Sequence, residues 1–215
     1  MKLHTVLFGI VLTVAGAARA DPIAAETSTS PSRAPFTQIG ISLGIGGGLT
    51  NFTGSEMNSA VDLGGSWEVR STIGTRLFLA GELAYVGSRR NVSMPGVTGA
   101  ADKPHVFAHG LEGALRAQLP YLTGRWLVEP FVFGGLGWTH MGIDGSVPAG
   151  SALRTSDDVL VVPFGAGISA GWNNVFLEGR FTYRATFNED LLARADGTAA
   201  DMGNWGIGAL VGYEF

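Results

Sequence analysis

The chain has 215 residues, of which 46% are hydrophobic and 15% are charged, and its formal net charge is −4. The acidic balance argues against nucleic acid as a partner, and the lack of cysteine excludes a disulfide framework and a thiolate metal site. With glycine at 33 positions, this composition is unusual for a soluble secreted protein.

Residues 1–20 have the features of a secretory signal peptide. Lys2 and His4 precede an apolar run from Val6 to Ala18, and small residues around Arg19 suit cleavage before Asp21. The run is short for a membrane span, so the pattern favours a cleaved signal over an uncleaved anchor. Cleavage would leave 12 basic residues against 18 acidic ones, a net charge of about −6.

Residues 21–35 are rich in Ser, Thr, Ala and Pro and have no apolar period, so we expect a flexible leader there. From residue 36 onward no stretch is long and apolar enough for a transmembrane helix. Instead, eight segments alternate apolar and small or polar residues with the period of a β-strand. They cover about residues 36–46, 61–73, 75–87, 105–119, 126–140, 160–172, 175–187 and 204–215.

The connections between these segments alternate in length. Short ones are expected near residue 74, at 120–125 and at 173–174, where Asn173-Asn174 favours a two-residue hairpin because Asn tolerates positive φ. Long ones are expected at about 47–60, 88–104, 141–159 and 188–203. Short turns at one end and long loops at the other are typical of membrane β-barrels, whereas a soluble sandwich has no reason to sort its connections by length.

The last segment, NWGIGALVGYEF, alternates most strictly and closes on the aromatic Phe215. It resembles the C-terminal assembly signal of bacterial outer-membrane barrels, which implies that Ile207, Val211, Tyr213 and Phe215 carry this signal. The whole of residues 36–215 resembles the small eight-stranded outer-membrane barrels of the OmpA transmembrane-domain and OmpX-like family. We therefore expect an all-β fold, an eight-stranded antiparallel up-and-down transmembrane β-barrel preceded by a periplasmic leader.

The resemblance also implies the location and the partners. We expect the protein in the outer membrane of a Gram-negative bacterium, in contact with lipids including lipopolysaccharide and with the barrel assembly machinery. The pairs Asp157-Asp158 and Glu189-Asp190 are candidates to hold divalent cations against lipopolysaccharide phosphates, and Arg89-Arg90 to meet such phosphates directly. The sequence does not indicate an extracellular ligand.

The inward faces of the segments carry six acidic and five basic side chains. An eight-stranded barrel is narrow enough to be filled by side chains, and buried charges are tolerated when they are paired. We therefore predict a structural charge network, with a selective pore as the alternative, and the turn positions predict Arg116 opposite Glu129, Glu178 opposite Ser169 and Arg180 opposite Gly167. The predicted members are Glu68, Arg70, Arg76, Glu82, Glu112, Arg116, Glu129, Glu178, Arg180, Arg184 and Glu214.

No catalytic, cofactor or metal motif emerges. The glycine run at residues 44–48 lacks the spacing of a phosphate-binding loop. His105 and His140 are expected side by side at the outer rim, but the serine that follows the histidine in lipid A deacylase barrels is missing after His140. We thus expect no enzyme activity and no cofactor.

The main hypothesis is a non-enzymatic surface protein that supports envelope integrity or makes adhesive or ligand contacts through external loops. One alternative is a small OmpW-like barrel that passes hydrophobic compounds, since an inward apolar set is expected at Phe78, Phe131, Phe133, Phe176 and Leu210. A lipid A-modifying barrel enzyme is the other.

Overall fold

Strand-forming segments pair into one antiparallel sheet. The computed structural model describes residues 32–33, 39–55, 61–91, 105–144, 156–187 and 203–215. Within these ranges the strands are β1 (Ser32–Arg33), β2 (Ile41–Phe52), β3 (Gly64–Ile73), β4 (Leu79–Asn91), β5 (His105–Gln118), β6 (Tyr121–Thr123), β7 (Trp126–Asp144), β8 (Ser156–Trp172), β9 (Val175–Phe187) and β10 (Asn204–Glu214).

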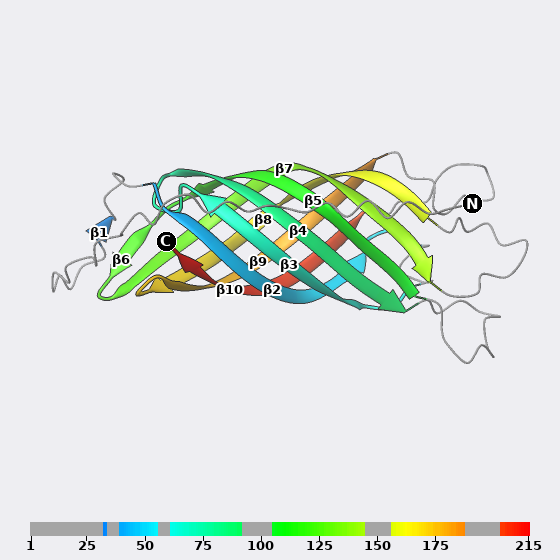
Figure 1. Cartoon of the computed structure of the whole chain (residues 1–215), viewed down its shortest axis with the longest axis horizontal. Helices are drawn as coiled ribbons and strands as arrows, with labels where there is room; N and C mark the ends of the chain where they lie inside the picture. The colour runs from blue at the N-terminus through cyan, green and yellow to red at the C-terminus, as the bar shows by residue number, and fades with distance from the viewer. Residues whose placement is uncertain (1–31, 34–38, 56–60, 92–104, 145–155, 188–202) are drawn as a thin grey trace, which may run out of the picture.

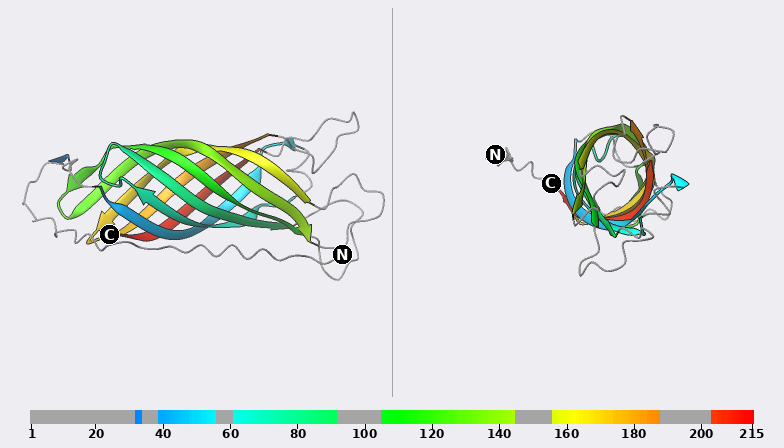
Figure 2. Two further views of the ribbon diagram at one scale, coloured as in Figure 1. Left: turned by 45° about the horizontal axis from the view of Figure 1, so that its top comes forward. Right: turned by 90° about the vertical axis from the view of Figure 1, so that its right-hand side faces the viewer.

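The sheet closes on itself. Each long strand pairs with its neighbours in the chain, β10 pairs with β2, and pairing of β7 with β8 completes the ring. The result is a closed, up-and-down barrel of eight strands, β2–β5 and β7–β10, which confirms the predicted fold. Figure 1 shows these strands tilted across the barrel, and the end-on view in Figure 2 shows the ring that they form. Each of the eight described barrel strands is therefore paired on both sides, as strands that contact lipid require.

Period-2 alternation separates two faces along every strand. In β4, for example, exposed Leu83 and Tyr85 alternate with buried Glu82 and Ala84. The outer face is an apolar girdle, with side chains between 36% and 70% exposed that include Ile45, Val69, Leu83, Leu111, Leu115, Val132, Leu136, Phe164, Ile168, Leu177, Phe181, Ile207 and Val211. An apolar patch of this extent has no place in water and is what a bilayer covers.

Tight turns join the strands at one end, here called the short-turn end. Asn173 and Asn174 have φ of 48° and 69° and link Trp172 to Val175, as a two-residue hairpin requires. This confirms the predicted hairpin, and with it Glu178 opposite Ser169 and Arg180 opposite Gly167. The opposite end, where the predicted long connections lie, is called the long-connection end.

Two strand boundaries differ from the prediction. β2 extends to Phe52, because its glycines pair with β3 on one side and β10 on the other, and the predicted loop therefore starts later than residue 47. Residues 74–78 form the turn that was predicted to be short, so the alternation begins at Leu79. Phe78 lies in this turn and is 50% exposed, which contradicts its predicted inward position.

The hairpin between β5 and β7 is shifted by four residues from the predicted register. The prediction placed the turn over residues 120–125, but β6 continues the ladder of β5 past Pro120, and the chain reverses at Gly124, whose φ is +62°. Arg116 therefore pairs with Phe133 and Glu129 pairs with Ser169, and the predicted pairing of Arg116 with Glu129 is wrong.

The predicted signal peptide, residues 1–20, lies outside the described residues. So does most of the predicted leader, of which Ser32 and Arg33 pair with Leu122 and Tyr121 of β6. Among the described residues, no helix has the length and hydropathy to cross a membrane.

The girdle predicts a depth-dependent cost for charge on the outer face. Leu83, at mid-barrel, is 61% exposed and Leu63, just before β3, is 51% exposed. We expect Leu83→Lys to destabilise the barrel in phospholipid vesicles by about 2–4 kcal/mol, and Leu63→Lys by about 1 kcal/mol or less. Equilibrium urea unfolding of both variants measures the difference, and equal costs would contradict a membrane girdle.

Candidate functional site

The lumen at mid-barrel holds a network of three arginines and three glutamates. Glu178 accepts hydrogen bonds from Arg70 and Arg116, both at 2.6 Å, and from Arg180 at 3.0 Å. Glu82 accepts from Arg180 at 2.9 Å and from Arg116 at 3.3 Å. Glu68 completes the set through Arg70 at 2.5 Å. Three positive and three negative charges thus neutralise each other inside the barrel.

Two phenylalanine rings support this network from β7. The guanidinium carbon of Arg116 lies 3.6 Å from the centroid of Phe131, and that of Arg180 lies 4.2 Å from the centroid of Phe133. A guanidinium stacked on a ring keeps its edge free for carboxylates while its face is shielded from water. The inward phenylalanines therefore hold the charged groups in place.

Separate ion pairs lie on either side of the central network. Arg184 donates to both oxygens of Glu112, at 2.6 and 3.2 Å. Nearer the short-turn end, Arg76 donates to Glu214 at 2.7 Å, and Thr75 donates to the same oxygen at 3.0 Å. The structure therefore gives an ionic partner to every predicted network residue except Glu129.

Glu129 is buried, and its Oε1 has no hydrogen-bond partner. The four-residue shift in register explains this position, since Arg116 reaches Glu82 and Glu178 instead. Toward the same end, Gln118 donates from Nε2 to the carbonyls of Gly74, Thr75 and Leu77, which fixes the β3–β4 turn across the lumen.

Toward the long-connection end the lumen becomes apolar. A buried cluster there comprises Phe52, Val61, Val106, Ala108, Met141, Val159 and Val161, with Ile143 packed against it. Charged layers, stacked rings and this cluster thus occupy successive levels of the described lumen.

Arg90 is an interior residue that the sequence pattern did not identify. The pattern predicted a loop in which Arg89 and Arg90 face lipid phosphates, but β4 continues through both residues, so Arg89 points outward and Arg90 inward. Arg90 is 3% exposed, and its Nη2 donates to Thr50 at 2.8 Å. Alternation counted from Glu82 would have found it, because 82 and 90 share a face.

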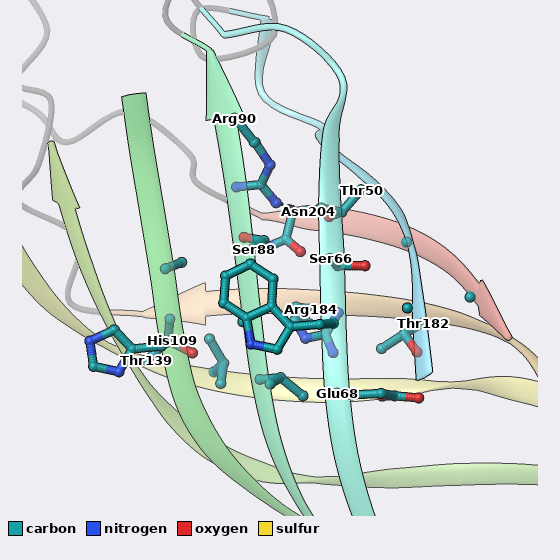
Figure 3. A pocket seen from close by; sticks show the side chains of 18 of the residues that line it. Thr50, Ser66, Glu68, Ser88, Arg90, His109, Thr139, Thr182, Arg184 and Asn204 are labelled. Atoms are coloured by element: carbon teal, nitrogen blue, oxygen red, sulfur yellow. Dashed lines mark hydrogen bonds between the residues drawn. The ribbon is translucent and has the colours of Figure 1, made fainter. Parts of the chain in front are cut away.

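Arg90 lines a chamber of about 70 Å³ between the central network and the long-connection end. Figure 3 shows Arg90 above Ser88, Thr50 and Asn204, with Arg184 further along the barrel. Its inward-facing polar side chains are Thr50, Ser66, Glu68, Ser88, Arg90, Thr139, Arg180, Thr182, Arg184 and Asn204. The apolar side chains Val86, Ala108, Met141 and Val161 line the same space.

An aromatic and imidazole cluster lies on the outer face near the long-connection end. His109 and His140 face each other across β5 and β7, with ring centroids 5.5 Å apart, and Phe107 stacks on His109. The predicted neighbours His105 and His140 are therefore not adjacent, because the register shift places His105 opposite Asp144. His140 Nδ1 lies 2.8 Å from Asp158 Oδ1.

Neither proposed cation site gains support from these contacts. Asp157 accepts a hydrogen bond from the backbone of Asp158 at 2.9 Å, while Glu189-Asp190 lies outside the described residues. Within the described ranges no three side chains of His, Asp or Glu are arranged to hold a metal ion.

The four C-terminal signal residues all lie on the outer face of β10. Ile207, Val211, Tyr213 and Phe215 are between 47% and 59% exposed. The rings of Tyr213 and Phe215 meet edge to face with centroids 5.2 Å apart. The same strand pairs with β2 and β9, so it forms the closing seam of the barrel.

Solved structures with the same architecture provide the comparison. Neisserial surface protein A matches with a TM-score of 0.51 at 13% identity, over 82% of this chain and 97% of that one. The fold is that of the small eight-stranded outer-membrane barrels. The predicted resemblance to this family of structures is thereby confirmed at the level of fold.

Two further barrels match at lower TM-scores. The N-terminal barrel domain of Pseudomonas aeruginosa OprF matches at 0.44 with 14% identity, over 83% of this chain and 100% of that one. The Yersinia pestis attachment invasion locus protein Ail, in complex with a heparin analogue, matches at 0.45 with 12% identity, over 82% and 97%. No protein-family model and no curated protein sequence matches the chain.

Removing one carboxylate from the central network should destabilise the barrel strongly. Glu82 is 7% exposed and receives contacts from three arginines, so Glu82→Gln leaves buried positive charge uncompensated. We expect a loss of about 3–5 kcal/mol in the free energy of unfolding. Asp158→Asn removes a carboxylate from the exposed pair with His140 and should cost less than about 1 kcal/mol. Urea unfolding in the same vesicles would argue against the network if the two costs were alike.

Proposed function

We propose that this protein is a non-enzymatic outer-membrane surface protein, which supports the envelope or makes adhesive contacts through the segments at its long-connection end. The filled lumen is the observation that carries this proposal. Apart from the chamber beside Arg90, side chains occupy the described lumen from Gln118 at one end to the cluster around Met141 at the other. A barrel filled in this way is suited to anchoring the segments at its ends.

The apolar girdle supports a location in a bilayer, and the fold supports the bacterial outer membrane. In such barrels short turns face the periplasm and long connections face outward, which would place Phe215 inside and residues 92–104, 145–155 and 188–202 outside. Neisserial surface protein A, which shares the fold, is by its name a surface protein. Lipids, including lipopolysaccharide, would then be the partners of the girdle.

Passage of hydrophobic compounds has weaker support. Phe131 and Phe133 face inward as predicted, but guanidinium groups of Arg116 and Arg180 lie on their rings. Phe176 lies against the backbone of Gly212, and Leu210 is 3% exposed. These apolar side chains are packed against other parts of the described interior, which leaves them little surface for a passing solute.

The proposal predicts that the barrel does not conduct ions and that loss of the protein changes surface contact or the envelope. Purified protein in planar lipid bilayers should show no steady open state. A deletion strain should change in adhesion, serum survival or envelope permeability, and the wild-type gene should restore the phenotype. A gene in which residues 145–155 are replaced by a Gly-Ser linker of equal length should restore barrel assembly and lose surface contact.

Four results would count against this function. A stable conducting state would favour a pore, uptake of hydrophobic solutes that depends on the gene would favour transport, and changed lipid A mass spectra on overexpression would favour an enzyme. A deletion strain without any phenotype would count against a role in the envelope.

We also propose that Ile207, Val211, Tyr213 and Phe215 form the signal read by the barrel assembly machinery. Their shared exposure on the closing strand supports this role, since a receptor would meet them before closure. Phe215→Ala should reduce outer-membrane accumulation in cells several-fold, while refolding into detergent stays close to wild type, because Phe215 is 48% exposed. Leu115→Ala removes an outward residue from β5 and serves as the control. Equal accumulation of both variants would contradict the assignment.

A further inference from the structure

Arg90 is a buried cation that has no counter-charge among the described residues. It is 3% exposed, its Nη2 donates to Thr50 Oγ1 at 2.8 Å, and its guanidinium carbon lies 4.2 Å from the centroid of Phe52. Nε and Nη1 have no hydrogen-bond partner among the described residues. Its contacts are therefore a neutral hydroxyl and an aromatic ring, and neither neutralises a full positive charge.

The other Arg and Glu side chains of the described chamber wall are neutralised. Glu68 is paired with Arg70, Arg180 with Glu82, and Arg184 with Glu112. Arg70 and Arg116 also have a nitrogen without a partner, but both form ion pairs through their other nitrogens. The described chamber wall thus carries one excess positive charge, and an isolated buried charge is costly.

The groups around Arg90 are suited to donating hydrogen bonds. Ser66, Ser88, Thr139, Thr182 and Asn204 line the same chamber. Thr50 is oriented by its own hydrogen bond, at 2.9 Å, to the carbonyl of Trp205, which leaves its oxygen to accept from Arg90. Figure 3 shows that these side chains come from strands on different sides of the barrel and converge on one space.

The chamber has room for a bound ion beside Arg90. We propose that this chamber is a binding site for a small inorganic anion, with Arg90 as its counter-ion and the surrounding hydroxyl and amide groups as additional donors. The site is inside the barrel, so it does not depend on the proposed surface function.

Anion titration of the purified protein tests this site. Protein in a nonionic detergent is titrated with inorganic phosphate and, separately, with chloride, at ionic strength held constant with gluconate as the balancing anion. Isothermal titration calorimetry reads binding, and the midpoint of thermal unfolding reads stabilisation, because a ligand of the folded state raises it. We expect saturable binding of phosphate or chloride and a matching rise in the unfolding midpoint.

Variants at two adjacent positions locate the bound anion. Arg90→Gln should weaken binding about 10-fold or more, since a hydrogen bond to a charged group is lost. Arg89→Gln changes the same residue type on the outward face and should bind as wild type does. Heat-modifiable mobility on gels shows whether each variant is folded, and Arg90→Lys, compared with Arg89→Lys, replaces the Gln variants if Arg90→Gln does not fold.

Two outcomes would overturn the proposal. Wild-type protein that shows no saturable binding of either anion has no such site. Binding that is unchanged in the folded Arg90 variant, or reduced equally by the Arg89 variant, would place the anion elsewhere on the molecule.

Discussion

The narrow lumen of an eight-stranded barrel is the constraint on which the rest of this structure depends. Strands that close at this number leave an interior just wide enough for side chains. Alternation sends every second residue into that space, and in this chain many of those residues are charged. Because a buried charge is tolerated only with a partner, the strands must register so that opposite charges meet. Glu82 and Glu178 satisfy this requirement with Arg70, Arg116 and Arg180.

The same closure accounts for the inverted distribution of polarity. Backbone groups are satisfied within the ring of strands, so the outer face needs only apolar side chains to contact lipid. Leu115 and Leu136 are 68% and 63% exposed there, while Gln118 is 1% exposed inside. The inner face of each strand therefore contributes charge pairing to stability, and the outer face places the barrel in lipid. Because the two faces alternate along a strand, moving a substitution by one residue changes which of these properties it affects.

Sequence patterns predicted which face of the sheet each residue occupies better than they predicted which residues pair between neighbouring strands. Period-2 alternation identifies which side of the sheet a residue occupies, and Glu178 and Arg180 could also be aligned across the hairpin because Asn173-Asn174 leaves a single tight turn. The β5–β7 hairpin could not be aligned in the same way, because Pro120 looked like a breaker and Gly124 was one of several turn candidates. Pro120 is instead buried between β5 and β6, which pair with β7 in one continuous register. A shift of four residues moved Arg116, Glu129 and His140 to different partners while each kept its face.

Arg90 was predicted in a loop for a related reason. Two charged residues near the end of a strand look like part of a loop when the length of the strand is not known.

The inner faces of β2 and β10 explain why there is room for the chamber beside Arg90. Gly44, Gly46 and Gly48 pair with Gly212, Leu210 and Gly208, so Leu210 is the one large side chain that these three pairs project inward. A Cβ at Gly46 would lie 2.8 Å from the backbone of Leu210. The long Arg and Glu side chains of β3, β4, β5 and β9 extend into the space that these glycines leave. Where these side chains pair with one another, they form the central network. Toward Gly206, where Arg90 meets no carboxylate among the described residues, they leave the polar chamber. The glycine run at residues 44–48, which lacks the spacing of a phosphate-binding loop, thus makes room for side chains inside the barrel.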